Sequence, residues 1–186
     1  CSSDLKTAKT GILKNCRDDI LNQTKQIIHY LIKDSNINRQ KFIGIGIAMQ
    51  GAVNVDRGVS VFSPYFSDWK DVPVGEILKK EFGIPVFVEH DPNCMALTEK
   101  WLGNANDIKN MLFIRLSMGI GMSIIINGEI YRGADGSAGE FGHITMNPDG
   151  ARCTCGNYGC LEVYASGRSL LQQAREGIKL GRASQA

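Results

Sequence analysis

Apolar residues recur at steps of three and four in several stretches of the chain, with charged and amide side chains between them. This spacing is typical of amphipathic helices. Pro92 is suited to opening a helix, and Gly83 and Gly103 are suited to ending one. The predicted helices cover residues 10–33, 72–82, 93–102 and 163–180.

Short apolar runs between these helices predict strands, which cover residues 41–49, 59–62, 85–89, 111–116, 122–126 and 129–132. Asn127-Gly128 is a strong hairpin signal, and residues 117–121 are predicted as a turn. Strands and helices alternate in the first half and a hairpin interrupts the second half, so the pattern predicts an α/β fold with mixed sheets. The chain opens on a helix and ends in GRASQA, so we expect a segment of a longer protein.

Composition narrows the possible classes of protein. Of 186 residues, 43% are hydrophobic, which excludes a disordered tail, and 21 Lys and Arg against 19 Asp and Glu leave a net charge of +2. The basic residues are scattered, so we do not expect this segment to bind DNA by itself. No apolar run approaches the ~20 residues that span a bilayer, and no signal segment is visible. We therefore expect a cytoplasmic protein without membrane contact.

The six cysteines fall into two groups. Cys1, Cys16 and Cys94 are isolated, and we interpret them as small apolar residues. The other three lie within eight residues of one another, and a histidine precedes the first by ten positions. Three thiolates and one imidazole are a typical ligand set for structural zinc, with no position left for a water. The predicted ligands are His143, Cys153, Cys155 and Cys160; the alternatives are three unrelated buried thiols, with His143 as a catalytic base.

Glu89-His90-Asp91 follows the apolar strand predicted over 85–89. Ligands of open α/β sheets bind beyond the carboxyl ends of strands, so Asp91 could act as a general base on a substrate hydroxyl. Asp91 could instead cap the helix that Pro92 opens, and its position alone favours this capping role over the catalytic one. Both roles are compatible, because they can use different oxygens.

Two further features are a pair of glutamates on either side of the cysteines and a pair of glycines earlier in the chain. Glu140 lies three residues before His143, and Glu162 lies two residues after Cys160. Carboxylates held by a metal-bound loop could accept hydrogen bonds from the hydroxyls of a sugar, although both could be ordinary surface charges. Gly119 and Gly121 could present backbone N–H groups to a phosphate, although a single GxG is a weak signal and by itself favours an ordinary hairpin turn.

Four segments together resemble the ROK family of repressors, open reading frames and kinases. They are GIGIAMQGAVN, FSDWKDVPVGEILKKEFGIPVFVEHDPNCMAL, GIGMSIIINGEIYRGADGSAGEFGH and CTCGNYGCLE. The last two are highly specific in combination, and the resemblance extends from about residue 40 onward.

The resemblance implies an actin-like ATPase (ribonuclease-H-like) fold, present here in part, with a zinc-bound loop and a sugar bound between two lobes. Residues 1–91 would belong to the N-terminal lobe and 92–186 would begin the C-terminal lobe. Asp91 matches the catalytic aspartate of the family's kinases, and His143 matches both a sugar contact and a zinc ligand. The sugar contacts implied by the resemblance are Gln50, Gly51, His90, Asp91, Glu140, His143 and Glu162.

Departures from the family pattern favour its repressor branch. The phosphate turn of the kinases is Gly-Thr-Gly, whereas this chain has Ser117-Met118-Gly119, and a thioether cannot donate to phosphate oxygen. The resemblance therefore implies the sugar-sensing part of a transcriptional repressor, which binds a sugar or phosphosugar. DNA would be bound by a helix-turn-helix domain outside this chain, and the protein would be a homodimer or homotetramer. The alternatives are a fragment of a sugar kinase that uses ATP and Mg²⁺, and a zinc-bound interaction module without sugar affinity.

Overall fold

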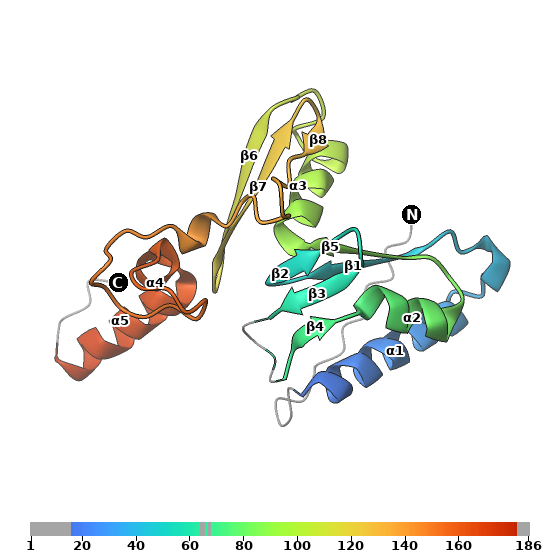
Figure 1. Ribbon diagram of the computed structural model, residues 1–186, viewed down its shortest axis with the longest axis horizontal. Coiled ribbons are helices and arrows are strands. Elements are labelled where there is room, and N and C mark those ends of the chain that lie inside the picture. Colours follow the sequence, from blue (N-terminus) through green and yellow to red (C-terminus); the bar gives the residue numbers. More distant parts are fainter. Residues whose placement is uncertain (1–15, 64–65, 67, 182–186) are drawn as a thin grey trace. The chain divides into compact units, whose positions relative to one another are not determined.

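The computed structural model describes residues 16–63, 66 and 68–181. The chain forms two compact units, Cys1–His90 and Asp91–Ala186 (Figure 1). Each contains helices and strands, which confirms the predicted α/β class. No helix within the described ranges is long and apolar enough to cross a bilayer.

The first unit combines a parallel strand pair, a three-stranded antiparallel sheet and two main helices. Strands β1 and β5 pair in parallel from Ile45↔Val86 to Met49↔His90, and β2, β3 and β4 are antiparallel in that order. Figure 1 shows α1 and α2 alongside each other. The elements are α1 (Arg17–Asp34), a 3-10 turn η1 (Arg39–Lys41), β1 (Ile45–Met49), β2 (Ala52–Asn54), β3 (Val59–Phe62), β4 (Lys70–Val72), α2 (Val74–Phe82) and β5 (Val86–His90).

The core of this unit forms where the apolar face of α2 meets the strands. Leu78 and Phe82 of α2 are buried together with Val72 of β4 and Val88 of β5. Leu21 of α1 belongs to the same cluster. Burial of these large side chains is the main stabilising contribution in this unit.

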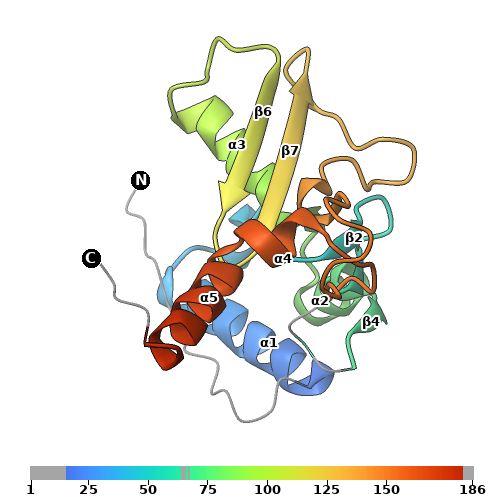
Figure 2. The same ribbon diagram turned by 90° about the vertical axis from the view of Figure 1, so that its left-hand side faces the viewer.

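The second unit contains an antiparallel sheet of order β6-β7-β8 and three helices. Figure 2 shows α3 lying against the β6–β7 pair, and α4 followed directly by α5. The predicted hairpin turn is confirmed, because Asn127 and Gly128 both have positive φ. The elements are α3 (Asp91–Leu102), β6 (Met111–Leu116), β7 (Ile120–Ile126), β8 (Glu129–Ile130), a 3-10 turn η2 (Phe141–His143), α4 (Leu161–Ala165) and α5 (Gly167–Lys179).

Several predicted boundaries in the first unit were wrong. The helix predicted over 10–33 runs from Arg17 to Asp34 in the structure, and residues 10–15 lie outside the described residues. The strand predicted over 41–49 begins only at Ile45, after the 3-10 turn. Val72 belongs to β4 because it pairs with Ser60, so α2 begins at Val74. The sequence interpretation missed β2 and β4, whose three residues each are too few for a visible alternation.

In the second unit the helix predicted over 163–180 is two helices. Ser166 has extended backbone (φ −75°, ψ 160°), and its hydroxyl accepts a hydrogen bond from the N–H of Ser169. A serine cap of this kind ends α4 and starts α5. The turn predicted over 117–121 is also shorter, because β7 begins at Ile120. The strand predicted over 129–132 ends at Ile130.

Candidate functional site

Predicted site residues of the second unit converge on the first two residues of β7, Ile120 and Gly121. The N–H of Ile120 donates a 2.8 Å hydrogen bond to Oε2 of Glu162 at the start of α4. The 3-10 turn that carries His143 packs on the same strand, because a Cβ atom at Gly142 would lie 2.3 Å from the carbonyl oxygen of Ile120. A hydrogen-bonded backbone therefore fixes the Glu162 carboxylate beside this turn.

Asp91 also lies near this end of β7, through its contact with β6. It opens α3, and its Oδ2 accepts a hydrogen bond from Nη1 of Arg115 on β6. Arg115 is paired with Gly121 across the β6–β7 ladder. Asp91 is thus held by the residue of β6 opposite Gly121, and Glu162 is held by the adjacent Ile120 of β7.

The four predicted metal ligands form one cluster. The potential ligand atoms of His143, Cys153, Cys155 and Cys160 all lie within 4.8 Å of one another. Nδ1 of His143 is 3.6 Å from Sγ of Cys153, and the sulfur atoms of Cys155 and Cys160 are 3.7 Å apart. The predicted grouping is therefore present in the structure.

The two shorter separations, 3.6 Å and 3.7 Å, match those around a zinc ion. Tetrahedral zinc with Zn–S of about 2.3 Å and Zn–N of about 2.05 Å places two sulfurs about 3.8 Å apart and a sulfur about 3.6 Å from a nitrogen. Burial raises the pKa of the Cys160 thiol to about 12, and the adjacent Cys155 and Cys153 reinforce the rise. Burial also acts to raise the pKa of Cys153, but hydrogen bonds from Cys155 and His143 leave it below its ordinary value. A divalent cation would favour the ionised form of the Cys160 thiol that ligates it.

Glycines shape the loop that brings the cysteines together. Gly159 has a positive φ, and a Cβ atom there would lie 1.6 Å from the carbonyl oxygen of Asn147. The N–H of Gly159 donates to the carbonyl of Ala151 at 2.8 Å, and the N–H of Cys153 donates to Asn157 at 2.7 Å. The sequence therefore folds the loop through backbone contacts that a side chain at position 159 would prevent.

Glu140 lies beside the ring nitrogen of His143 that faces away from the sulfur atoms. Its Oε2 is 3.8 Å from Nε2 of His143, and the Glu140 side chain is 41% exposed. A carboxylate beside the distal nitrogen of a ligating histidine is a common outer partner that orients the imidazole. Glu140 therefore belongs to the surroundings of the cluster, and its exposed carboxylate remains accessible to a ligand.

The remaining predicted sugar contacts lie in the first unit. His90 ends β5 and pairs with Met49 at the end of β1, so Gln50 and Gly51 follow the carboxyl end of the neighbouring strand. Gly51 has φ +82°, and a Cβ atom there would lie 2.2 Å from the carbonyl oxygen of Phe62. These three residues share the edge of the parallel pair at which α/β proteins bind ligands.

The two phosphate-loop candidates have different positions. Gly119 lies in the turn, and its carbonyl accepts from the N–H of Ser117 at 3.0 Å. Gly121 lies inside β7, and a Cβ atom there would come within 2.8 Å of Cγ of Pro92. Packing against the first turn of α3 therefore explains Gly121 without a phosphate.

Sequence interpretation missed Arg115. Its position in the alternation of β6 was a usable signal, because residues 111, 113 and 115 must share one face of the strand. That face packs on α3, where Asp91 lies, so the alternation could have paired the two side chains.

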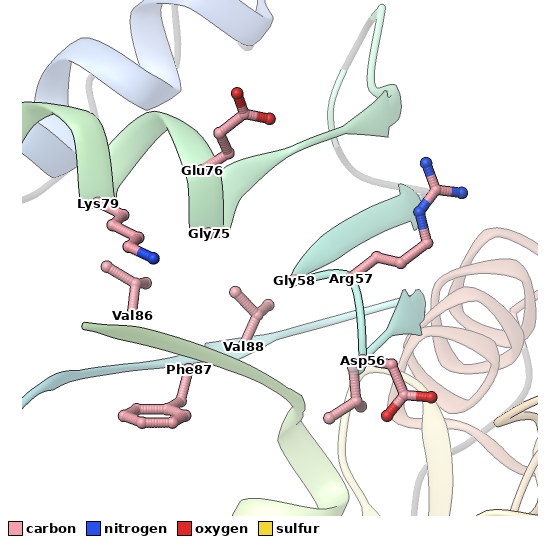
Figure 3. Close-up of a pocket in the computed structure, with 10 residues that line it drawn as sticks. Asp56, Arg57, Gly58, Gly75, Glu76, Lys79, Val86, Phe87 and Val88 are labelled. Carbon is pink, nitrogen blue, oxygen red and sulfur yellow. The ribbon is translucent and has the colours of Figure 1, made fainter.

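A pocket of about 410 Å³ in the first unit contains none of the predicted site residues. Figure 3 shows it between β5, with Val86 and Val88, and α2, with Glu76 and Lys79. The close approach of Gly58 and Gly75 forms one wall, because the N–H of Gly75 donates to Gly58 at 2.9 Å. Its charged lining residues comprise two of each sign, so the pocket favours neither anions nor cations.

Comparison with known proteins shows which family the chain resembles. The family model described as "ROK family" matches residues 2–185. A putative xylose repressor of Caldicellulosiruptor sp. is 37% identical over 165 residues, which are 89% of this chain and 41% of that protein. The chain thus spans less than half the length of this relative.

Two solved structures share the architecture. A ROK family transcriptional regulator described as a homolog of the E. coli MLC protein is 33% identical with a TM-score of 0.81, and the match covers 97% of this chain and 46% of that one. A ROK family glucokinase from Streptomyces griseus, in complex with glucose and AMPPNP, is 33% identical with a TM-score of 0.77 over 89% and 51%. The predicted family is confirmed: the chain belongs to the ROK family and has part of its actin-like ATPase fold.

Proposed function

We propose that this chain is the sugar-sensing effector region of a ROK-type transcriptional repressor. The observation that carries the proposal is the convergence of Asp91, Glu162 and the turn bearing His143 on the start of β7. Carboxylates accept hydrogen bonds and donate none, so a fixed pair of them suits the hydroxyl groups of a sugar. Gln50, Gly51 and His90 are proposed as sugar contacts of the first unit.

The proposed metal cluster would also hold the candidate sugar-binding carboxylates in place. His143, Cys153, Cys155 and Cys160 would hold zinc, which would supply a closed structural centre and no open position for chemistry. Glu140 contacts the imidazole of His143, and Glu162 follows Cys160 by two residues. A rigid loop would therefore present both carboxylates to the sugar already in position, which reduces the entropy lost on binding.

Two features support the repressor over the kinase. Met118 stands in the turn where a kinase needs a phosphate donor, and Gly121 serves packing against Pro92. The likeness to a xylose repressor makes D-xylose the first effector to test. DNA binding would belong to a helix-turn-helix domain of the full-length protein, which we propose to be a homodimer or homotetramer.

The second candidate is an ATP-dependent sugar kinase. It is favoured by the likeness to the glucokinase bound to glucose and AMPPNP, and by the position of Asp91 at the end of the β5 strand. In that case Asp91 would be the general base toward a sugar hydroxyl, and Mg²⁺ with ATP would be needed.

One experiment on the full-length protein separates these functions. Sugar affinity is measured by calorimetry with D-xylose, D-glucose and their phosphates, alongside sugar-dependent release of genomic DNA fragments held by the immobilised protein. We expect one neutral or phosphorylated sugar to bind and to release DNA, without ADP formation from Mg²⁺·ATP. Sugar-dependent ADP formation without DNA retention would instead establish the kinase.

A matched pair of variants tests the site itself. Glu162→Gln removes the charge anchored to Ile120, and we expect an affinity loss of about tenfold, since charge-assisted hydrogen bonds are the stronger ones. Glu176→Gln is the control, because Glu176 is an exposed residue of α5 whose carboxylate accepts a hydrogen bond from Gln172. Equal affinity in both variants would remove Glu162 from the site.

A further inference from the structure

Arg115 is a charged residue at the candidate site that the proposed function leaves without a role. Its guanidinium donates to Oδ2 of Asp91, and the two side chains are 34% and 16% exposed. Such charge-assisted contacts are shorter and stronger than neutral hydrogen bonds, and partial burial protects them from salt.

Two features of the fold bring Arg115 and Asp91 together. Arg115 lies on the face of β6 that packs against α3, and its partner across the ladder is Gly121. Because Gly121 has no side chain, Pro92 and the first turn of α3 can lie directly on β7. The carboxylate of Asp91 is thereby brought to the guanidinium opposite the glycine.

This contact bears on what Asp91 can do. A general base must receive the proton of the hydroxyl it activates, within hydrogen-bond distance of that hydroxyl. Arginine keeps its protons in proteins and accepts none, so it can neither relay a proton nor release one to Asp91. An acceptor that merely holds a sugar hydroxyl needs only a fixed orientation, and a neighbouring guanidinium supplies that.

We propose that Arg115 is a positioning residue, which fixes the Asp91 carboxylate as an acceptor for a sugar hydroxyl. The proposal rests on the proposed sugar-sensing function. It adds a residue that acts on the sugar through Asp91.

The test uses the full-length protein and D-xylose and D-glucose as probes. Arg115→Gln is expected to lower the affinity for the sugar that binds by about tenfold, because the Asp91 carboxylate loses its fixed orientation. Arg115→Lys restores the charge without the planar fork, and we expect it to recover affinity to within about threefold of the unmodified protein. Recovery by lysine distinguishes positioning from general packing damage.

A double-mutant cycle shows whether Arg115 acts through Asp91. Asp91→Asn alone is expected to weaken binding about tenfold or more, and Arg115→Gln added to it should change the affinity by less than about threefold. Independent, multiplying losses would overturn the proposal, as would an Arg115→Gln variant that binds as tightly as the unmodified protein.

Phosphoryl transfer supplies the third readout. With Mg²⁺·ATP and sugar, the unmodified protein is expected to form no ADP above the sugar-free background. Sugar-dependent ADP formation that Arg115→Gln slows at unchanged sugar affinity would make Arg115 part of a catalytic apparatus and overturn the proposal. A protein that binds no sugar at all would instead refute the proposed function, and this outcome is seen before any variant is made.

Discussion

The core of the first unit and the cysteine loop of the second, residues 143–162, are held together by different means. The first unit buries large apolar side chains, with Leu78 at 0% and Phe82 at 1% exposure. In the loop the buried side chains are those of Cys153 and Cys160, while Met146 and Tyr158 are 59% and 50% exposed.

The difference shows which interaction stabilises the folded conformation of each region. Apolar burial offsets the conformational entropy of the first unit, as in any domain core. The loop has almost no apolar burial to do so, and a four-ligand metal centre can take its place. The candidate sugar residue Glu162 lies at the end of this loop, and Glu140 lies just before it.

The largest expected effect is therefore on the loop. If zinc occupies the cluster as proposed, Cys160→Ser should release it and leave residues 143–162 exchanging their amide hydrogens within seconds, because structural zinc contributes on the order of 10 kcal/mol. The core around Leu78 should remain protected. Metal analysis and hydrogen exchange measure both, with Cys16→Ser as the control, since Cys16 contacts Asp19 outside the cluster. A Cys160→Ser protein with its full zinc content would contradict the ligand assignment.

The next effect addresses the apolar core. Leu78→Ala should lower the free energy of unfolding of the first unit by about 2–5 kcal/mol, because it removes fully buried methyl groups and leaves a cavity. Urea unfolding can be followed by Trp69, which is 4% exposed, in a Trp101→Phe background. Ile37→Ala is the matched control at a 50% exposed position. Zinc content should stay unchanged, and its loss would link the two regions.

Several features of the fold and of the candidate site could be predicted from the sequence alone. The cysteine spacing predicted the cluster, because few other uses bring three thiols and an imidazole within eighteen residues. Periodicity predicted α2 and the strand β6 with its boundaries. Both signals, the cysteine spacing and the hydrophobic periodicity, lie within a short segment of sequence, so no contact between distant segments was needed to interpret them.

What escaped prediction depends on contacts between distant segments. The break at Ser166 follows from its side-chain cap, which competes with a continuous helical pattern. The close packing of Gly121 on Pro92, twenty-nine positions away, could not be predicted from the local GxG pattern. The anchoring of Glu162 to Ile120 and of Asp91 to Arg115 likewise requires the tertiary fold.

The smallest effects come from two fully buried serines, one in each unit. Ser60 accepts a 2.8 Å hydrogen bond from Nε1 of Trp69, whereas the buried hydroxyl of Ser123 has no hydrogen-bond partner among the described residues. Ser60→Ala should cost about 1–3 kcal/mol, because it strands the indole N–H.

Ser123→Ala removes a hydroxyl that is desolvated without compensation, so its unfolding free energy should change by about 0–1 kcal/mol toward greater stability. Denaturation of both variants, followed by circular dichroism, measures the difference. Equal destabilisation by the two substitutions would mean that the Ser123 hydroxyl makes a bond that this structure lacks. A difference in the expected direction would show that the Ser123 hydroxyl contributes no hydrogen bond to β7, the strand that anchors Glu162.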